Sequence, residues 1–337
     1  MKGYRAYFGK KLLWYLITLV IAVFLNFLLP RLIPGNPVQT IISDMTAGIA
    51  DTNRYKQIYD TFAAQFGIDK PIWQQFVIYL GNLFHGNLGV SFSLYPRPVS
   101  DIIGAALPWT LMLQIPAIIV GWLLGNVLGA LAAYMKGVWD KAVFPVFLFF
   151  AAVPPFAMAL ILVWLFANTW HWFPGSLGYD FDMIINVNSW RFWLSVLSHY
   201  RLPFLSMVLV TIGGQSLGMR EMSIYELNAD YVKYSRLMGI RDRKIVGYVF
   251  RNAMLPQITG LALSLGTMIG GALITEIVFS YPGLGTTMFK AISNQDYPLI
   301  SGCTLMITIT VLAANFLVDI ICGIIDPRVK ATQQEEG

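Results

Sequence analysis

The chain has 337 residues, of which 56% are apolar and 12% are charged, and its formal net charge is +5. A soluble domain carries about 25% charged residues, so this composition cannot cover the surface of a water-soluble globule. A soluble enzyme and a disordered chain are thereby excluded, and an all-α polytopic membrane protein is indicated. The histidines lie far apart, and Cys303 and Cys322 form neither a disulfide framework nor a zinc spacing. We therefore expect no metal site and no cofactor.

A transmembrane helix needs about 20 consecutive, mostly apolar residues. The sequence predicts six such spans, at residues 12–29, 102–135, 142–170, 202–219, 252–279 and 297–325. The first follows Lys10 and Lys11 and resembles a signal peptide only in that basic start, because its apolar core is too long and no cleavage site follows. It is therefore expected to remain as the first span. Six spans place both termini on the same side of the membrane.

Lys and Arg set the predicted orientation. With the N-terminus inside, the inner segments carry most of the Lys and Arg residues, and the short outer loops carry few. The positive-inside rule then places both termini in the cytoplasm. Because this orientation explains the basic excess, no nucleic-acid partner is needed.

Glycines repeat every four residues on one face of the second span, at Gly121, Gly125 and Gly129. Small residues let helix backbones approach closely in lipid. We interpret the repeat as packing within the helix bundle; the alternative is a dedicated dimer motif.

Two long segments are not spans. Residues 31–101 are expected outside, and apolar groups at helical spacing predict short helices at 55–66 and 72–84. Residues 220–251 are expected inside. They carry many charges, and their pattern predicts a short helix, a stop near Gly239 and a second helix over Arg241 to Arg251. Such a compact charged segment is suited to docking another protein, although composition alone favours a solvated loop.

The order of residues carries a resemblance. The inner segment has Arg220, then Leu227-Asn228-Ala229-Asp230-Tyr231-Val232, Arg236, Gly239 and Arg251-Asn252-Ala253-Met254-Leu255-Pro256. Further matches on its C-terminal side are Glu276-Ile277-Val278-Phe279-Ser280-Tyr281-Pro282-Gly283-Leu284-Gly285, Asp296-Tyr297-Pro298, Asn315-Phe316-Leu317-Val318-Asp319 and Asp326-Pro327-Arg328. The N-terminal half adds Pro34-Gly35-Asn36-Pro37-Val38, Gly67-Ile68-Asp69-Lys70-Pro71, Gly86-Asn87-Leu88-Gly89-Val90-Ser91 and Trp172-Phe173-Pro174. In this order the chain resembles the permeases of ATP-binding-cassette importers, and more narrowly the first permease of the oligopeptide, dipeptide and nickel uptake systems.

The chain departs from the family pattern at three places. Lys233-Tyr234-Ser235 stands where the wider superfamily has Glu-Ala-Ala, Asn36 stands where Asp is more common, and Pro154-Pro155-Phe156 replaces Ser-x-Pro-x-Phe in the third span. The first change lies in the inner segment. The other two lie near the expected outer gate and path, so they bear on substrate more than on mechanism.

The resemblance implies a fold and a set of partners. The fold is the type I importer permease (MetI-like) fold, one permease domain over residues 1–337 with a helical extracytoplasmic insertion after the first helix. The implied partners are a second permease subunit, two cytoplasmic ATP-binding subunits and an extracytoplasmic substrate-binding protein, in the lipid of a prokaryotic cell membrane. The sequence has no Gly-x-x-x-x-Gly-Lys-Ser/Thr loop. The chain is therefore expected to be a transport subunit and not an enzyme, with ATP hydrolysed by its partners.

The implied substrate is a peptide of the oligopeptide or dipeptide class, with an oligosaccharide or a nickel chelate as the alternatives. Trp170, Trp172, Trp190 and Trp193 crowd one outer loop, and indole faces suit sugars, but Trp also collects at membrane interfaces. A membrane enzyme is disfavoured because His85, His171 and His199 are expected outside the spans and no catalytic motif is present. The sequence shows no pore-lining ring or selectivity filter of a channel. A receptor or scaffold without transport remains the weaker alternative.

Three groups of site residues follow from the resemblance and the pattern. The segment that couples the permease to ATPases is expected to use Asp230, Tyr231, Lys233, Ser235, Arg236, Gly239 and Arg243. The gate and pathway are expected to include Glu276, Tyr281, Pro282 and Gly283. The contact with the binding protein is expected at Tyr55, Phe62, Trp73, Tyr79 and Arg97.

Overall fold

The computed structural model describes residues 2–32, 60, 70–135, 137–183 and 185–325. Over these residues the regular structure is helical, and the one isolated β-bridge joins Val90 and Pro98. The chain divides into two compact units. The first comprises residues 1–8, 110–282 and 311–337, and the second comprises residues 9–109 and 283–310.

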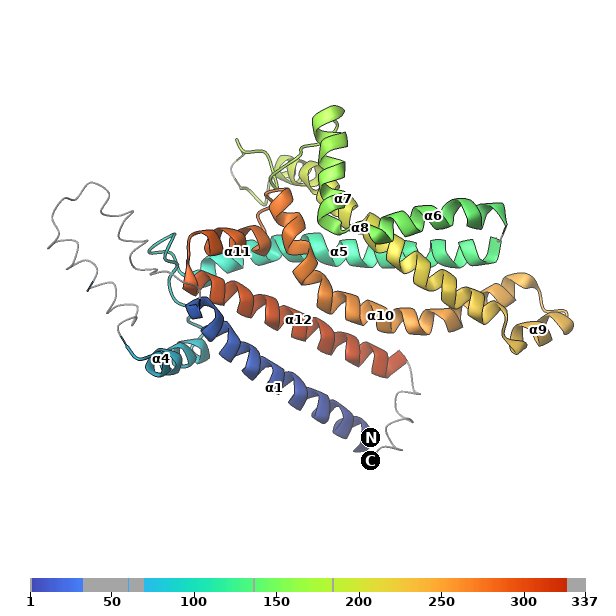
Figure 1. The fold of residues 1–337 in the computed structure, drawn as a ribbon, viewed down its shortest axis with the longest axis horizontal. Coiled ribbons are helices and arrows are strands. Elements are labelled where there is room, and N and C mark those ends of the chain that lie inside the picture. Colours follow the sequence, from blue (N-terminus) through green and yellow to red (C-terminus); the bar gives the residue numbers. More distant parts are fainter. Residues whose placement is uncertain (1, 33–59, 61–69, 136, 184, 326–337) are drawn as a thin grey trace. The chain divides into compact units, whose positions relative to one another are not determined.

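The predicted spans coincide largely with helices, and the third is interrupted at Val153-Pro154 (Figure 1). The helices are α1 (Lys2–Leu32), α5 (Val99–Met135), α6 (Val138–Ala152), α7 (Pro155–Leu162) with the π-helix η1 (Val163–Thr169), α8 (Trp190–Leu227), α10 (Asp242–Val278) and α12 (Tyr297–Ile325). In the part of the chain searched, α1, α5, α8 and α12 each hold a stretch long and apolar enough to span a membrane, and the bent pair α6–α7 brings the number to five. The span expected at 252–279 lies in α10, where the side chains of residues 259 and 262–272 are outside the described set. Six spans therefore stay a prediction.

The helix that contains the fourth predicted span is longer than that span. Helix α8 begins at Trp190 and continues to Leu227, so His199 lies inside a helix and the inner segment begins as the end of α8. The physical reason is that Arg201 and Arg220 limit how far a helix can lie in hydrocarbon, but not how far the helix itself extends. Pro203 is accommodated within α8.

The third span is broken rather than continuous. The axes of its two halves differ by 105°, and Figure 1 shows α7 turning away from α6. Val153 and Pro154 are extended, with ψ of 123° and 149°. A proline disfavours the α conformation at the residue before it, and Pro154-Pro155 applies this constraint twice in succession. Pro155 then starts α7, where its missing N–H costs nothing because the first N–H groups of a helix have no partner.

Helix α8 is packed closely in the first unit, and glycines make this possible. An added Cβ would lie 2.6 Å from Cβ of Thr211 at Gly121, 2.6 Å from Cβ of Gln215 at Gly125, and 2.3 Å from the Ser216 carbonyl oxygen at Gly129. The Ser216 hydroxyl also donates to the Gly125 carbonyl at 3.0 Å. The glycine repeat of α5 thus contacts α8 of the same chain, which confirms the interpretation as packing within the bundle.

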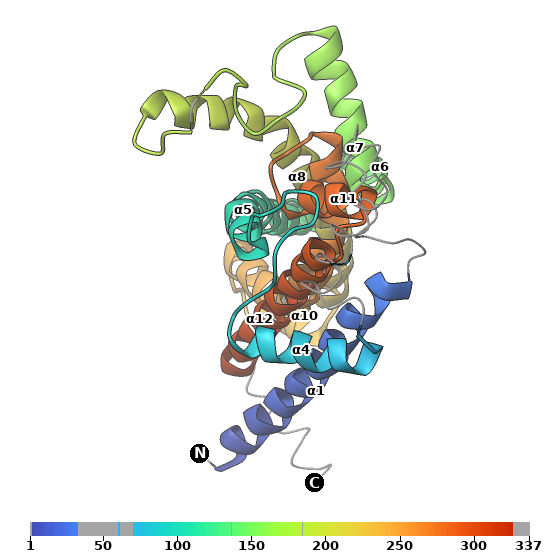
Figure 2. The ribbon, with the colours of Figure 1, turned by 90° about the vertical axis from the view of Figure 1, so that its left-hand side faces the viewer.

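In the second unit, helix α4 (Ile72–Phe84) lies across the end of α1 (Figure 2). The ring of Phe76 lies 5.0 Å from that of Phe27, and the Arg31 guanidinium donates from Nε to Gln75 at 3.1 Å. The helix predicted at 72–84 is confirmed. The helix expected at 55–66 lies, apart from residue 60, outside the described residues.

A buried carboxylate joins residues 91–93 to α12 within this second unit. Asp296 accepts hydrogen bonds from the hydroxyl of Ser91, from the backbone N–H and hydroxyl of Ser93 at 2.9 and 2.8 Å, and from the N–H of Leu299 at 3.2 Å. The last bond lies in the first turn of α12, where a carboxylate is favoured. The same unit contains α11 (Leu284–Ser293).

The α5–α8 contact generates a test of stability. Gly129→Ala would place Cβ 2.3 Å from a backbone oxygen, so the two helices must separate, at a cost of about 1–3 kcal/mol. We expect a lower thermal unfolding temperature in detergent. Gly214→Ala in α8, where nothing lies within 4 Å of the new Cβ, is the matched control and should be neutral. An equal loss in both variants, or a loss in neither, would contradict the packing role.

Candidate functional site

The segment between α8 and α10 folds as the sequence predicts. Helix α9 (Asp230–Leu237) is followed by a turn in which Gly239 has φ of +73°. The N–H groups of Gly239 and Ile240 donate to the carbonyls of Arg236 and Ser235, each at 3.0 Å. Such a turn needs a left-handed residue, and glycine adopts this conformation without steric cost. The second predicted helix is the beginning of α10.

A small apolar core holds α9 on its two neighbours. Val232 on α9 clusters with Ile245 and Val249 on α10, and all are buried. Leu227, Tyr231 and Ile240 pack around this cluster. The face of α9 that packs on α8 and α10 is therefore fixed by burial.

Glu226, near the end of α8, adds a polar tether that the sequence reasoning missed. The hydroxyl of Tyr231 donates to its Oε2 at 2.7 Å, and Nδ2 of Asn252 donates to the same oxygen at 3.4 Å. Burial, followed by the hydrogen bond to Glu226, raises the pKa of Tyr231 to about 12, so the phenol remains a donor at neutral pH. One carboxylate thus links α8, α9 and α10. Its only sequence signal is an acidic residue directly before the Leu227–Val232 motif.

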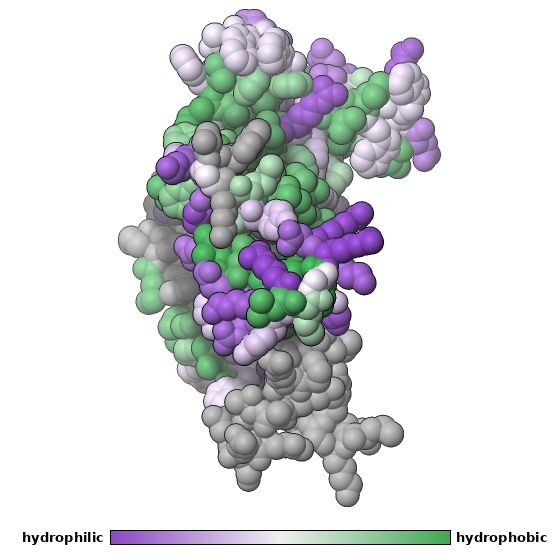
Figure 3. Space-filling model, turned by 90° about the vertical axis from the view of Figure 1, so that its right-hand side faces the viewer, coloured by the Kyte–Doolittle hydropathy of each residue, from purple (hydrophilic) through white to green (hydrophobic). Residues whose placement is uncertain are grey.

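The exposed face of α9 combines apolar and basic side chains. Tyr234, Leu237 and Met238 are 65%, 83% and 70% exposed. Figure 3 views the molecule from the side that α9 occupies in Figure 1, and it shows apolar surface beside projecting hydrophilic side chains. Sequence reasoning missed these three residues, although apolar residues in a strongly charged segment are a readable signal.

The predicted residues of this segment separate into two groups. Asp230, Lys233, Arg236 and Arg243 are exposed, whereas Ser235 is buried and Tyr231 is half-buried. Lys233 lies 3.1 Å from Asp230, and Arg236 lies 3.9 Å from Asp242. Exposed ion pairs contribute about 0–1 kcal/mol each, so these charges contribute little to the fold.

The predicted gate residues lie at the end of α10 and just beyond it. Glu276 and Tyr281 are fully buried, and the Tyr281 N–H donates to the Glu276 carbonyl at 2.8 Å. The Leu177 N–H donates to the Phe279 carbonyl at 2.7 Å, which fixes the turn to the loop that contains Leu177. The left-handed residue of this turn is Ser280, with φ of 48°, whereas Gly283 has φ of −95° as the N-cap of α11. Pro282 is half-buried.

The residues predicted to meet a binding protein are only partly described. Trp73 on α4 is 64% exposed, and Arg97 is exposed. Tyr79 instead packs on Phe27, with ring centroids 5.5 Å apart. Tyr55 and Phe62 lie outside the described residues.

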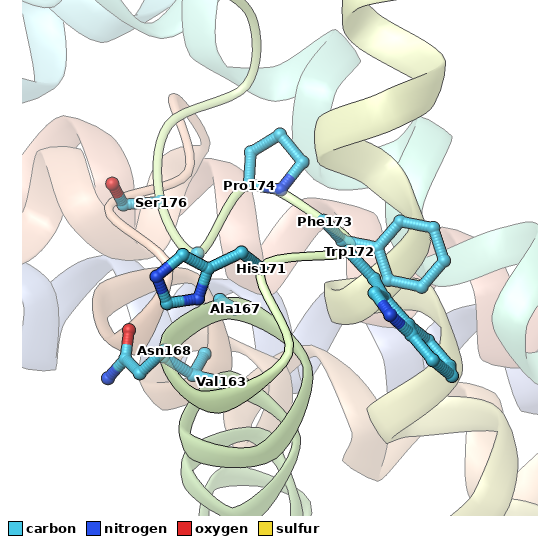
Figure 4. A pocket seen from close by; sticks show the side chains of 9 residues that line it. Val163, Ala167, Asn168, His171, Trp172, Phe173, Pro174 and Ser176 are labelled. Carbon is cyan, nitrogen blue, oxygen red and sulfur yellow. The ribbon is translucent and has the colours of Figure 1, made fainter.

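An open cavity of about 680 Å³ lies between η1 and the loop that follows it. Its lining residues are Val163, Ala167, Asn168, His171, Trp172, Phe173, Pro174, Gly175 and Ser176. Figure 4 shows His171 and Asn168 on one side of the loop and the rings of Trp172 and Phe173 on the other. None of these side chains is an acid, a lysine or an arginine. Among the described residues, no group of three or more His, Cys, Asp or Glu could hold a metal ion.

Comparison with known proteins places these features in one family. The family model described as "Binding-protein-dependent transport system inner membrane component" matches residues 125–331. The chain is 31% identical to the di/tripeptide transport system permease protein DppB of Pseudomonas aeruginosa, over 91% of this chain and 93% of that protein. It is 33% identical to a putative peptide permease protein of Brucella ovis and 30% identical to the dipeptide transport system permease protein DppB of Escherichia coli, each over 91% of this chain and 93% of the relative. The chain therefore belongs to the family of binding-protein-dependent transport system inner membrane components.

Proposed function

We propose that this chain is a permease subunit of an ATP-driven importer and forms half of the translocation path for peptides. The observation that carries the proposal is the match to peptide permeases over nine-tenths of the chain. A second permease, two cytoplasmic ATP-binding subunits and an extracytoplasmic binding protein complete the machine. This role needs no catalytic residue in the chain itself.

The proposed arrangement in the membrane has six spans, with both termini in the cytoplasm. The bent pair α6–α7 counts as one span, and the apolar part of α10 counts as another. Residues 31–101 then lie outside and residues 220–251 inside. The excess of Lys and Arg in the inner segments supports this orientation.

Helix α9 is the proposed contact with the ATP-binding subunits. Its inner face is occupied by the Val232 cluster and by Tyr231, so its outward side chains are available to a partner. Exposed Tyr234, Leu237 and Met238 would enter an apolar groove, and Lys233, Arg236 and Arg243 would lie at its polar rim. Interfaces commonly combine an apolar centre with a polar rim.

The buried residues at the end of α10 are the proposed outer gate. An ionisable residue at membrane depth usually faces protein or a water-filled path, and Glu276 is fully buried. Glu276 would order the turn that includes Tyr281, Pro282 and Gly283.

Sugar import is the alternative. The observation in its favour is the aromatic cluster on the outer loop, where the rings of Trp170 and Trp172 lie 4.7 Å apart. The deciding experiment is to purify the cognate binding protein and to identify its bound ligand by mass spectrometry. A bound peptide supports the proposal, and a bound sugar establishes the alternative.

Gly239→Val tests the coupling role of α9. No atom lies within 4 Å of an added Cβ, and the positive φ costs a residue other than glycine about 1–2 kcal/mol. We expect transport to fall at least about tenfold and the ATP-binding subunits to dissociate more readily during purification. Gly247→Val, at an equally open position within α10, is the control. Normal transport by an intact Gly239→Val complex would refute the coupling role.

Glu276→Gln tests the gate. The amide has nearly the shape of the carboxyl group but cannot ionise, so folding and membrane level should be preserved. We expect transport-coupled ATP hydrolysis to fall several-fold, measured in vesicles at matched amounts of protein. Full activity in the Gln variant would leave Glu276 a purely structural carboxyl group.

Trp73→Ala tests the contact with the binding protein. An exposed Trp at the centre of an interface typically contributes more than 1 kcal/mol. We therefore expect the ratio of stimulated to basal ATP hydrolysis to fall about fivefold when loaded binding protein is added. Trp190→Ala, equally exposed but in α8, should keep the ratio. An unchanged ratio for Trp73→Ala would remove Trp73 from the contact, and a parallel fall of both rates would indicate a folding defect.

A further inference from the structure

A charge pair joins α6 to α8 in the first unit. Nε and Nη2 of Arg220 donate to Oδ1 and Oδ2 of Asp140, each at 2.6 Å. This two-pronged geometry fixes direction as well as distance. The two side chains are only 19% and 21% exposed, so water weakens the pair less than it weakens an exposed ion pair.

Both partners of Arg220 lie on one face of α6. The guanidinium also lies over the ring of Phe144, 4.7 Å from its centroid, and Phe144 is one turn after Asp140. Asp140 is in the first turn of α6, where the helix dipole favours an acid. The start of α6 is therefore held at a defined point along α8.

The other end of α6 packs on α8 through closely approaching backbones. At Gly213 an added Cβ would lie 2.5 Å from the backbone nitrogen of Ala151. Gly213 and Arg220 are two turns apart and hence share a face of α8. The same face of α8 thus contacts both ends of α6, one through close backbones and one through charge.

These two contacts lie between the end of α8 that leads to α9 and the bend that follows α6. Arg220 is two turns before Leu227, where α8 ends and the connection to α9 begins. Ala151 lies directly before the 105° bend that separates α6 from α7. A displacement of α9 by a partner would act on α8, and α8 holds α6 at both ends.

We propose that Arg220 and Asp140 are positioning residues that make α6 move with α8, so that displacement of α9 reaches the bend between α6 and α7. The inference rests on the proposed import function and names a residue pair through which ATP hydrolysis is coupled to that function. Without the charge pair, only the contact at Gly213 remains of these two. Helix α6 can then pivot about Ala151.

The test uses the whole complex in liposomes, with dipeptide uptake and ATP hydrolysis measured in the same vesicles. Arg220→Met and Asp140→Asn should each lower the amount of dipeptide imported per ATP about fivefold or more, the lower end of the range for energetic coupling between sites. The double variant Asp140→Arg with Arg220→Asp restores opposite charges and should recover part of this loss. Lys141→Met removes an exposed cation next to Asp140 and is the matched control, with an unchanged ratio.

The ratio is compared only among variants that assemble with all subunits, as judged by size-exclusion chromatography. If Arg220→Met does not assemble, Arg220→Lys replaces it, because Lys keeps the charge but loses the two-pronged geometry. An unchanged ratio in the single variants would overturn the proposal, as would a charge-swapped variant no better than either single variant. If the unaltered complex imports no dipeptide with loaded binding protein, the proposed function fails instead, and this outcome is seen before any variant is tested.

Discussion

The close contact of α5 with α8 is the constraint on which the first unit depends. Two helices in lipid gain little from hydrophobic burial against each other, since lipid tails are as apolar as leucine side chains. Their attraction depends on dispersion contacts and on hydrogen bonds at short range. Gly121, Gly125 and Gly129 remove the side chains that would keep the backbones apart, and the Ser216 hydroxyl reaches the Gly125 carbonyl across the contact. Because α8 continues without a break to Leu227, the position set by these glycines is also the origin of α9.

The bend after α6 shows how a membrane helix can be broken at low cost. Backbone N–H and C=O groups in hydrocarbon need partners within the protein. At the break the Val153 N–H still bonds to the Phe149 carbonyl, and the Met158 N–H bonds to the Pro154 carbonyl. Pro154 and Pro155 have no N–H, so the two donors that a break would otherwise expose are absent. A pair of prolines is therefore a chemically economical way to turn a span.

Features that depend on local periodicity could be predicted from the sequence, and features that depend on distant pairs could not. The helix at 72–84, the Gly239 turn and the glycine face of α5 each follow from residues within two or three turns of one another. The Arg220–Asp140 pair, the bond from Asn252 to Glu226 and the Asp296 cluster join residues up to 205 positions apart. One sequence holds no record of such pairs.

The ends of the helices could not be predicted from span limits for a different reason. Hydropathy reports where a helix can lie in lipid, and α8 extends past both limits because its polar ends need only continuous backbone hydrogen bonds. The segment that contains α9 could be recognised from the sequence, but which of its residues are buried and which are exposed could not. Tyr231 turned out to be half-buried and Ser235 buried, whereas Tyr234, Leu237 and Met238 are exposed.

The departure from Glu-Ala-Ala at residues 233–235 has a physical reading in this structure. Position 235 is buried, so a small side chain suits it, and serine meets this requirement as alanine would. Positions 233 and 234 are exposed, and substitution there changes the surface without disturbing the core. Lys233 and Tyr234 therefore leave the shape of α9 intact while they exchange an acid for a base and a methyl group for an aromatic ring. Since both side chains are exposed, their chemistry can change without loss of the fold.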